Sequence, residues 1–172
     1  IEEIKTQREL SAAENNELTI HPESLHSAAL LQEIACEYAN HDAFKDRILV
    51  VDREAADVKF ESDRTLLLRV IGNLVKNALE ASQPGETVTL GCFSDSDGVS
   101  FWVHNPAVMP RDVQLQIFQR SFSTKGSGRG LGTYSIKLLS ERYLKGRVSF
   151  TSSPGEGTKF VVHYPWRLSS TA

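Results

Sequence analysis

The apolar side chains of residues 63–82 recur at intervals of three and four, which is the period of a helix with one buried face. The apolar positions on that face are Leu67, Val70, Ile71, Leu74, Ala78 and Leu79. Asp63 can accept a hydrogen bond from a free N–H group of the first turn, and Gln83-Pro84-Gly85 ends the pattern. We therefore expect a central amphipathic helix that begins at Asp63.

The rest of the pattern predicts short strands and further helices. The helices are expected at residues 1–17, 24–40, 110–118 and 131–144. Single strands are expected at residues 18–21, 47–52 and 58–61, and hairpins at 87–93 with 99–104 and at 148–152 with 159–163. Because neighbouring strands mostly form hairpins, we expect an α/β two-layer sandwich, with a mixed, mostly antiparallel sheet and helices on one face.

Two asparagines lie beside the apolar face of the central helix. Asn73 and Asn77 are four residues apart, so their amides lie one above the other on the same side. Lys76 and Glu80 form a second pair with the same spacing, one residue further round the helix. A core helix does not need two stacked amides, which makes them candidates for ligand binding. The alternative is a solvated face that holds two asparagines by chance.

A glycine-rich stretch lies at residues 118–132. Its alternating glycines are Gly126, Gly128, Gly130 and Gly132. Glycine lets backbone N–H groups approach an anion closely, and Lys125 and Arg129 add positive charge. The helix expected from Leu131 would present its positive end to the same anion. These features favour a polyphosphate ligand over a flexible linker, although the stretch lacks the Gly-Lys-Ser/Thr ending of a P-loop.

Four motifs in order resemble those of the sensor histidine kinases, within the wider GHKL family of ATPases and kinases. Residues 73–78 resemble the N box, 118–122 the F box, 128–132 the G2 box and 155–158 the last glycine box. The resemblance implies the Bergerat-type ATP-binding fold, with a lid at about residues 119–129. It also implies three parts: the end of a dimerisation helix at 1–17, the catalytic domain at 18–166 and a tail at 167–172.

The resemblance implies an Mg·ATP site on these residues. Asn77 would be an oxygen ligand of Mg²⁺, and Asn73, one turn earlier, would order the metal waters or the phosphates. Lys76 and Lys125 would meet phosphate charge, although Lys76 could equally pair with Glu80 on the surface. The other residues expected at the nucleotide are Asn105, Phe122, Gly128, Arg129, Gly130, Leu131, Gly132 and Thr158.

The segment expected to bind adenine departs from the family pattern. The first glycine box usually reads Asp-x-Gly-x-Gly, and its Asp accepts a hydrogen bond from the adenine amino group. Residues 103–110 contain no glycine and place Asn105 where that Asp would stand. An Asn carbonyl can still accept from the amino group, but it lacks the charge that strengthens the bond, so weaker adenine binding is expected. Thr158 would lie near the adenine through its hydroxyl and a water molecule, or would be an ordinary strand residue.

The amide of Asn73 separates two branches of the family. Members that hydrolyse ATP, the gyrase, Hsp90 and MutL types, carry a Glu there that activates water as a general base. An amide cannot accept that proton, so we expect phosphoryl transfer to a protein His rather than autonomous hydrolysis. The acceptor His would lie on a dimerisation domain outside this chain, and the phosphate would then pass to a response regulator.

Composition and charge narrow the class of protein. The 172 residues carry a net charge of −3, so nucleic acid is not expected as a partner. Cys36 and Cys92 fit no metal spacing and are expected to be buried, reduced thiols of a cytoplasmic domain. Without a run of roughly 18 apolar residues, no membrane contact is expected of this domain, while the parent protein could be membrane-anchored. We expect the isolated domain to be a monomer and the parent a homodimer.

Two alternatives remain open from the sequence. The degenerate segment at residues 105–110 favours a pseudokinase or scaffold that keeps the fold but binds nucleotide poorly. A Ser/Thr kinase of the anti-sigma type would use the same fold, although the stalk-like residues 1–17 argue against it. Nucleotide binding separates the leading interpretation from the first alternative. The identity of the phosphorylated residue separates it from the second.

Overall fold

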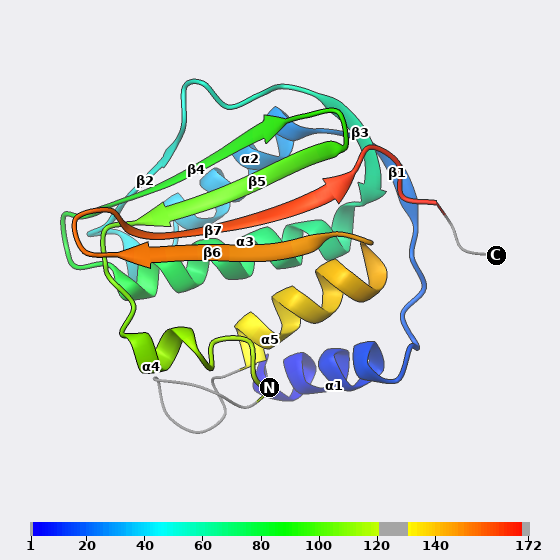
Figure 1. Ribbon diagram of the computed structural model, residues 1–172, viewed down its shortest axis with the longest axis horizontal. Helices are drawn as coiled ribbons and strands as arrows, with labels where there is room; N and C mark the ends of the chain where they lie inside the picture. The colour runs from blue at the N-terminus through cyan, green and yellow to red at the C-terminus, as the bar shows by residue number, and fades with distance from the viewer. Residues whose placement is uncertain (1, 121–130, 170–172) are drawn as a thin grey trace.

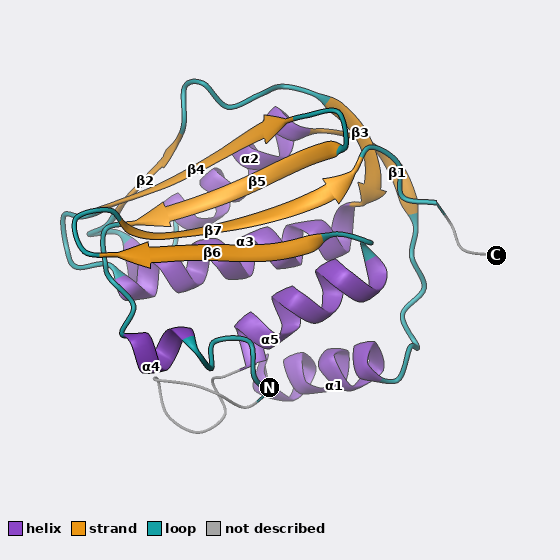
Figure 2. Cartoon of the chain, viewed as in Figure 1, coloured by secondary structure: helices purple, strands orange, loops and turns teal. Residues whose placement is uncertain are grey.

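A five-stranded sheet covered on one face by helices forms the body of the molecule (Figures 1 and 2). The computed structural model describes residues 2–120 and 131–169. The strand order is β2-β4-β5-β7-β6; the β2–β4 pair is parallel and the other three pairs are antiparallel. The strands are β2 (Ile48–Val51), β4 (Thr87–Ser94), β5 (Gly98–Asn105), β6 (Arg147–Ser153) and β7 (Gly157–Pro165). The predicted two-layer fold is confirmed.

The central helix is α3 (Arg64–Ala81), which lies across the sheet with its apolar face in the core. Asp63 caps it as predicted, because the Asp63 carboxylate accepts a hydrogen bond from the Leu66 N–H at 3.0 Å. The other helices are α1 (Glu2–Glu14), α2 (Ser27–Ala39), α4 (Arg111–Gln114) and α5 (Leu131–Leu138), with a 3-10 turn at Asp42–Phe44 and a π turn at Leu139–Tyr143. The π turn completes the helix predicted to end at residue 144.

The strand predicted at residues 18–21 is wrong, because the chain forms its strand a few residues later. β1 (Pro22–His26) pairs antiparallel with β3 (Lys59–Asp63) in a separate two-stranded sheet. This ladder satisfies the backbone of β1 and buries Leu25, so α2 begins at Ser27 rather than at residue 24.

Two further predictions need correction. The helix predicted at residues 110–118 reduces to the four residues of α4. The chain then turns, and the Phe118 ring packs against Phe150, with ring centroids 5.8 Å apart. The segment expected as a tail after residue 166 begins with packed residues: the Leu168 N–H donates to the Glu61 carbonyl at 3.1 Å, and Leu168 is 1% exposed. Backbone pairing with β3 therefore continues to Leu168.

The two cysteines differ. Cys92 is buried on β4, and burial raises the pKa of its thiol to about 11, as expected for an inert core thiol. Cys36 is exposed on α2, so its predicted burial is wrong. Cys36 lies on the face of α2 opposite the buried Ile34, which the helical period allows.

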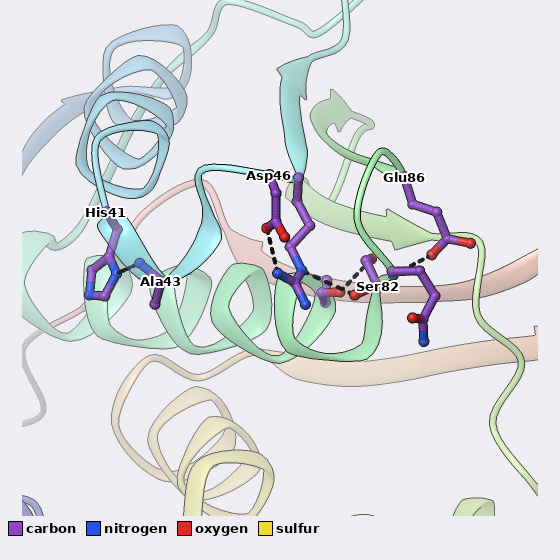
Figure 3. A network of polar contacts seen from close by, with 8 residues as sticks. His41, Ala43, Asp46, Ser82 and Glu86 are labelled. Atoms are coloured by element: carbon purple, nitrogen blue, oxygen red, sulfur yellow. Dashed lines mark hydrogen bonds and ion pairs between the residues drawn. The ribbon is translucent and has the colours of Figure 1, made fainter.

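The carboxyl end of α3 is fixed from outside the helix (Figure 3). Nε of Arg47 donates to the Ser82 carbonyl at 3.0 Å, and Nη1 of Arg47 contacts the Asp46 carboxylate at 2.6 Å. The Ser82 hydroxyl donates to the Ala78 carbonyl at 2.8 Å. A cation at the end of a helix satisfies a free carbonyl and opposes the negative end of the dipole. This half of α3 carries both asparagines and is therefore held in place.

Helix α1 is docked on the domain through its last turn. Leu10 and Ala13 are buried, and the Tyr143 hydroxyl donates to the Ala13 carbonyl at 2.6 Å. The Glu14 carboxylate accepts from Nε of Arg120 at 2.6 Å and from the Tyr134 hydroxyl at 3.1 Å. The hydrogen bond from Arg120 lowers the pKa of Glu14. Apolar contact and charge-assisted hydrogen bonds together hold the helix.

Replacing Glu14 with glutamine is expected to loosen α1, because the neutral amide bonds Arg120 more weakly than the carboxylate does. Hydrogen exchange should become faster for the amides of α1 and remain unchanged for those of α3. Glu17→Gln, an exposed position beyond the helix, is the matched control and should leave both rates unchanged. Equal protection of α1 in the native chain and in Glu14→Gln would contradict this role.

We expect His163 to make the stability of the sheet depend on pH. It is buried on β7, and its Nδ1 lies 2.8 Å from the Ser100 hydroxyl of β5. Burial, helped by the nearby Arg147 charge, lowers the pKa of His163 below its ordinary value. The unfolded chain therefore takes up a proton at a higher pH than the folded chain does. The contribution of His163 is complete above about pH 6.5 and is lost as the pH falls towards the folded pKa.

In His163→Gln the unfolding free energy is expected to fall less steeply than in the native chain as the pH is lowered from about 7 to about 5. Urea denaturation at several pH values measures that slope. His26→Gln, at an exposed position on β1, is the control and should keep the native slope. A slope in His163→Gln as steep as in the native chain would show that other groups carry the pH dependence.

Candidate functional site

The paired amides of α3 lie where the next helix begins. Asn73 and Asn77 are half-buried, whereas Lys76 is exposed. A Cβ atom placed on Gly132 would lie 3.7 Å from both Oδ1 and Nδ2 of Asn77. The first turn of α5 therefore lies close beside the Asn77 carboxamide, which brings the asparagine pair and the end of the glycine-rich stretch together. The N–H groups and positive end of α5 face the same region.

A second group of predicted residues meets at one end of the sheet. Asn105 ends β5 and is 5% exposed; Thr158, its partner in the β5–β7 register, is 4% exposed. Gly157 precedes Thr158 with a φ of 79°, and a Cβ on it would lie 2.3 Å from the Asn105 carbonyl oxygen. Figure 1 shows this end of β5 at the left of the molecule, on the same side as the carboxyl end of α3. The predicted adenine-binding residues are thus adjacent.

The Thr158 hydroxyl holds the loop that follows β5. Its hydroxyl donates to the Ala107 carbonyl at 2.8 Å and lies 2.7 Å from the Ser152 hydroxyl on β6. The Ser152 hydroxyl in turn accepts from the Met109 N–H at 2.8 Å. These bonds fasten the loop after Asn105 to the hairpin. Sequence analysis missed Ser152, although the opposed hydroxyls at the end of the predicted hairpin were a usable signal.

Several predicted site residues lie outside the described part of the chain. They are Phe122, Lys125, Gly128, Arg129 and Gly130, together with most of the expected lid. Leu131 is placed as the first residue of α5. Just before that stretch, the Phe118 ring lies edge-on to the Phe160 ring, with the two centroids 6.3 Å apart. Nζ of Lys137 lies 5.5 Å from the centroid of the Phe118 ring. The chain before residue 121 is therefore anchored on the sheet.

The donor groups suit a metal that arrives with its nucleotide. Within residues 2–120 and 131–169, no group of three or more His, Cys, Asp or Glu side chains is arranged to hold a metal ion. The Asn77 carboxamide offers a neutral oxygen beside the first turn of α5. Mg²⁺ prefers oxygen ligands and usually keeps waters and substrate phosphates among them. The site fits an Mg²⁺ ion whose remaining ligands are phosphate oxygens and water.

Comparison with known proteins decides the family. The sequence profile described as "Histidine kinase-, DNA gyrase B-, and HSP90-like ATPase" matches residues 62–168, more than half of the chain. The chain belongs to this ATPase family. Membership implies that the domain binds ATP, and the matched segment runs from the start of α3 through the last hairpin.

Sensor kinases are among the similar proteins. Sensor protein DegM of Bacillus sp. (strain B21-2) is 39% identical over 95 residues, which cover 54% of this chain and 25% of that protein. Sensor histidine kinase DcuS of Escherichia coli (strain K12) is 33% identical over 130 residues, which cover 69% of this chain and 22% of that protein. The chain thus spans a quarter or less of the length of these two relatives.

Two solved structures share the fold. The catalytic domain of histidine kinase ThkA superposes with a TM-score of 0.75 at 21% identity, covering 87% of this chain and 100% of that one. Full-length ShkA in complex with AMPPNP gives a TM-score of 0.72 at 22% identity, covering 90% of this chain and 33% of that one. The expected ATP-binding fold is confirmed.

In the described parts of the chain, none of the helices has the length and apolar content needed to cross a bilayer.

Proposed function

We propose that this chain is the catalytic, ATP-binding part of a sensor histidine kinase. It would transfer the γ-phosphoryl group of Mg·ATP to a His on a dimerisation domain outside residues 1–172, for relay to a response regulator. The observation that carries the proposal is that the Asn77 carboxamide lies close beside the first turn of α5, which places an oxygen able to bind a metal next to a helix N-terminus. The name of the relative DcuS, a sensor histidine kinase, supports the same activity.

Each residue has a role in this proposal. Asn77 would hold Mg²⁺ through its carbonyl oxygen, with Asn73 one turn away ordering the metal waters. Lys76 would approach the phosphates from the exposed side of α3, and Lys125 from the glycine-rich stretch. Gly128, Gly130 and Gly132 would offer backbone N–H groups to the phosphates, beside Phe122, Arg129 and Leu131. At the other end of the site, Asn105 would accept a hydrogen bond from the adenine amino group, next to Thr158.

The chemistry follows from the amides. A nitrogen of the acceptor His forms a bond to the γ-phosphorus, and the bond from that phosphorus to the bridging oxygen of ADP breaks. No residue of α3 needs to remove a proton from water, which suits a site with Asn73 rather than a carboxylate. Positioning and neutralisation of phosphate charge supply the catalysis. In this proposal the parent protein acts as a homodimer in the cytoplasm or at the membrane.

The test is phosphorylation of the parent protein with ATP labelled at the γ-phosphorus. We expect label on the protein that is lost in acid and kept in alkali, the behaviour of a phosphoramidate on His, and that moves to a response regulator. Asn77→Ala should abolish the labelling. Acid-stable label on Ser would instead support the anti-sigma type of kinase. No label on a parent protein that binds ATP would contradict the kinase function.

A second function is favoured by one observation. The loop at residues 106–110 has two prolines and no glycine, and Asn105 provides no charge for the adenine amino group. A module that keeps the fold but binds nucleotide weakly would act as a docking or relay domain. This second function would be favoured if the chain binds ATP without transferring the phosphoryl group, or if the folded chain binds no ATP.

A further inference from the structure

A continuous chain of hydrogen bonds lies beside Asn105. The Met109 N–H donates to Ser152 Oγ at 2.8 Å, Ser152 Oγ lies 2.7 Å from Thr158 Oγ1, and Thr158 Oγ1 donates to the Ala107 carbonyl at 2.8 Å. Ser152 and Thr158 are partners in the register of β6 and β7. The chain of bonds therefore begins and ends on the loop after β5 and passes through two strands of the sheet.

The direction of this chain is fixed by its ends. A backbone N–H can donate and cannot accept, and a backbone carbonyl can accept and cannot donate. The single hydroxyl hydrogen of Thr158 is used by the Ala107 carbonyl, so the bond between the hydroxyls must run from Ser152 to Thr158. Both hydroxyl hydrogens are then occupied. Thr158 keeps a free lone pair, and with it the capacity to accept but not to donate a further hydrogen bond.

We propose that Ser152 is a positioning residue: it holds the loop whose Ala107 carbonyl keeps Thr158 an acceptor, and it thereby selects a 6-amino purine over a 6-oxo purine. The inference rests on the proposed function, because it places the purine of ATP beside Asn105 and Thr158. An exocyclic amino group has two hydrogens, one to donate to the Thr158 hydroxyl and one to donate to the side-chain carbonyl of Asn105. An oxo group at that position has none, and it would bring its own lone pairs towards the Thr158 oxygen. Selectivity of this kind arises from unpaired polar groups.

Ser152 also holds the loop that carries the site. The loop is fastened at Ala107 and at Met109, whose carbonyl accepts from Nε2 of Gln114 at 2.8 Å. Removal of the Ser152 hydroxyl takes away the acceptor for the Met109 N–H and the donor for Thr158. Once the Met109 N–H has lost its acceptor, the loop and its Ala107 carbonyl can move away, and the Thr158 hydroxyl can then rotate and donate elsewhere. The acceptor character of the site is lost together with the fixed position of the loop.

The experiment is titration of the whole chain with ATP, ITP and tripolyphosphate, each with Mg²⁺. The native chain should prefer ATP over ITP, which carries an oxo group in place of the amino group. Ser152→Ala should lower that preference about fivefold, the loss of roughly one neutral hydrogen bond, and leave tripolyphosphate binding unchanged. Ser152→Thr keeps the hydroxyl and should restore the preference. Ser153→Ala, which removes a hydroxyl bonded to Glu156 at 3.3 Å, is the control on the neighbouring position.

The outcomes separate this inference from the proposed function. An unchanged ratio of ATP to ITP affinity in Ser152→Ala, with normal binding by the native chain, overturns the inference alone. An equal loss of ATP, ITP and tripolyphosphate binding, or a Ser152→Thr variant that behaves like Ser152→Ala, also overturns it. A folded native chain that binds neither nucleotide overturns the proposed function, and the inference with it.

Discussion

Asn77→Ala is expected to weaken binding of an Mg·ATP analogue at least about tenfold, which is about 1.4 kcal/mol. The Asn77 carboxamide lies against the first turn of α5, where it can offer its oxygen to a metal held by the phosphates. Alanine removes that oxygen without filling the space. Calorimetric titration with a non-hydrolysable analogue in excess Mg²⁺ measures the change directly.

Two controls show whether the loss is due to the metal. In the presence of a chelator the native chain and Asn77→Ala should bind the analogue with similar affinity, because neither then has a metal to hold. Asn40→Ala removes an exposed carboxamide at the end of α2 and should leave binding unchanged in Mg²⁺. Equal affinity of Asn77→Ala and the native chain in Mg²⁺ would exclude Asn77 as a ligand.

Gly157→Ala is expected to lower the unfolding free energy by roughly 3 kcal/mol. Gly157 has a φ of 79°, a backbone conformation that L side chains rarely adopt, and its Cβ would lie 2.3 Å from the Asn105 carbonyl oxygen. The β5–β7 ladder would have to open at Asn105 and Thr158 to admit the methyl group. ATP binding should therefore fall as well as stability. Urea denaturation and analogue titration measure the two effects.

Gly155→Ala is the matched control, in the same turn. Gly155 has a φ of 84°, but nothing lies within 4 Å of a Cβ built on it. The substitution has the same backbone strain without the clash, so it should cost about 1 kcal/mol and leave nucleotide binding unchanged. Equal destabilisation by the two substitutions would show that backbone strain alone matters and that the close approach to Asn105 does not.

The central helix could be predicted because its signals are local. The apolar period, the Asp63 cap and the breaking Gln83-Pro84-Gly85 all lie within or beside the helix. The strand β1 could not be placed in the same way, because its register depends on pairing with β3, far along the chain. The alternation of apolar and polar residues at 18–21, just before β1, led to the wrong strand prediction. Leu18 and Ile20 in fact pack against the core without forming a ladder.

The site could be predicted in part for similar reasons. The two amides of α3 and the turn before Thr158 are visible as spacing and as glycine positions. The hydrogen bond between Ser152 and Thr158 joins residues 6 positions apart in the sequence, and that between Arg120 and Glu14 joins residues 106 positions apart. Both depend on a geometry that the spacing of residues does not encode. The replacement of the first glycine box by Asn105 and a proline-containing loop is clear in sequence. How that loop is held became clear from the structure.

The most direct test of the account is an amide NMR titration of the native chain with a non-hydrolysable ATP analogue and Mg²⁺. The account predicts shifts on α3 around Asn73 and Asn77, on the first turn of α5, and at Asn105 and Thr158. Exposed Phe93 on β4 is the reference and should not shift. Shifts confined to the face of the sheet away from the helices, or no shifts in a folded chain, would contradict an ATP site between α3 and the ends of β5 and β7.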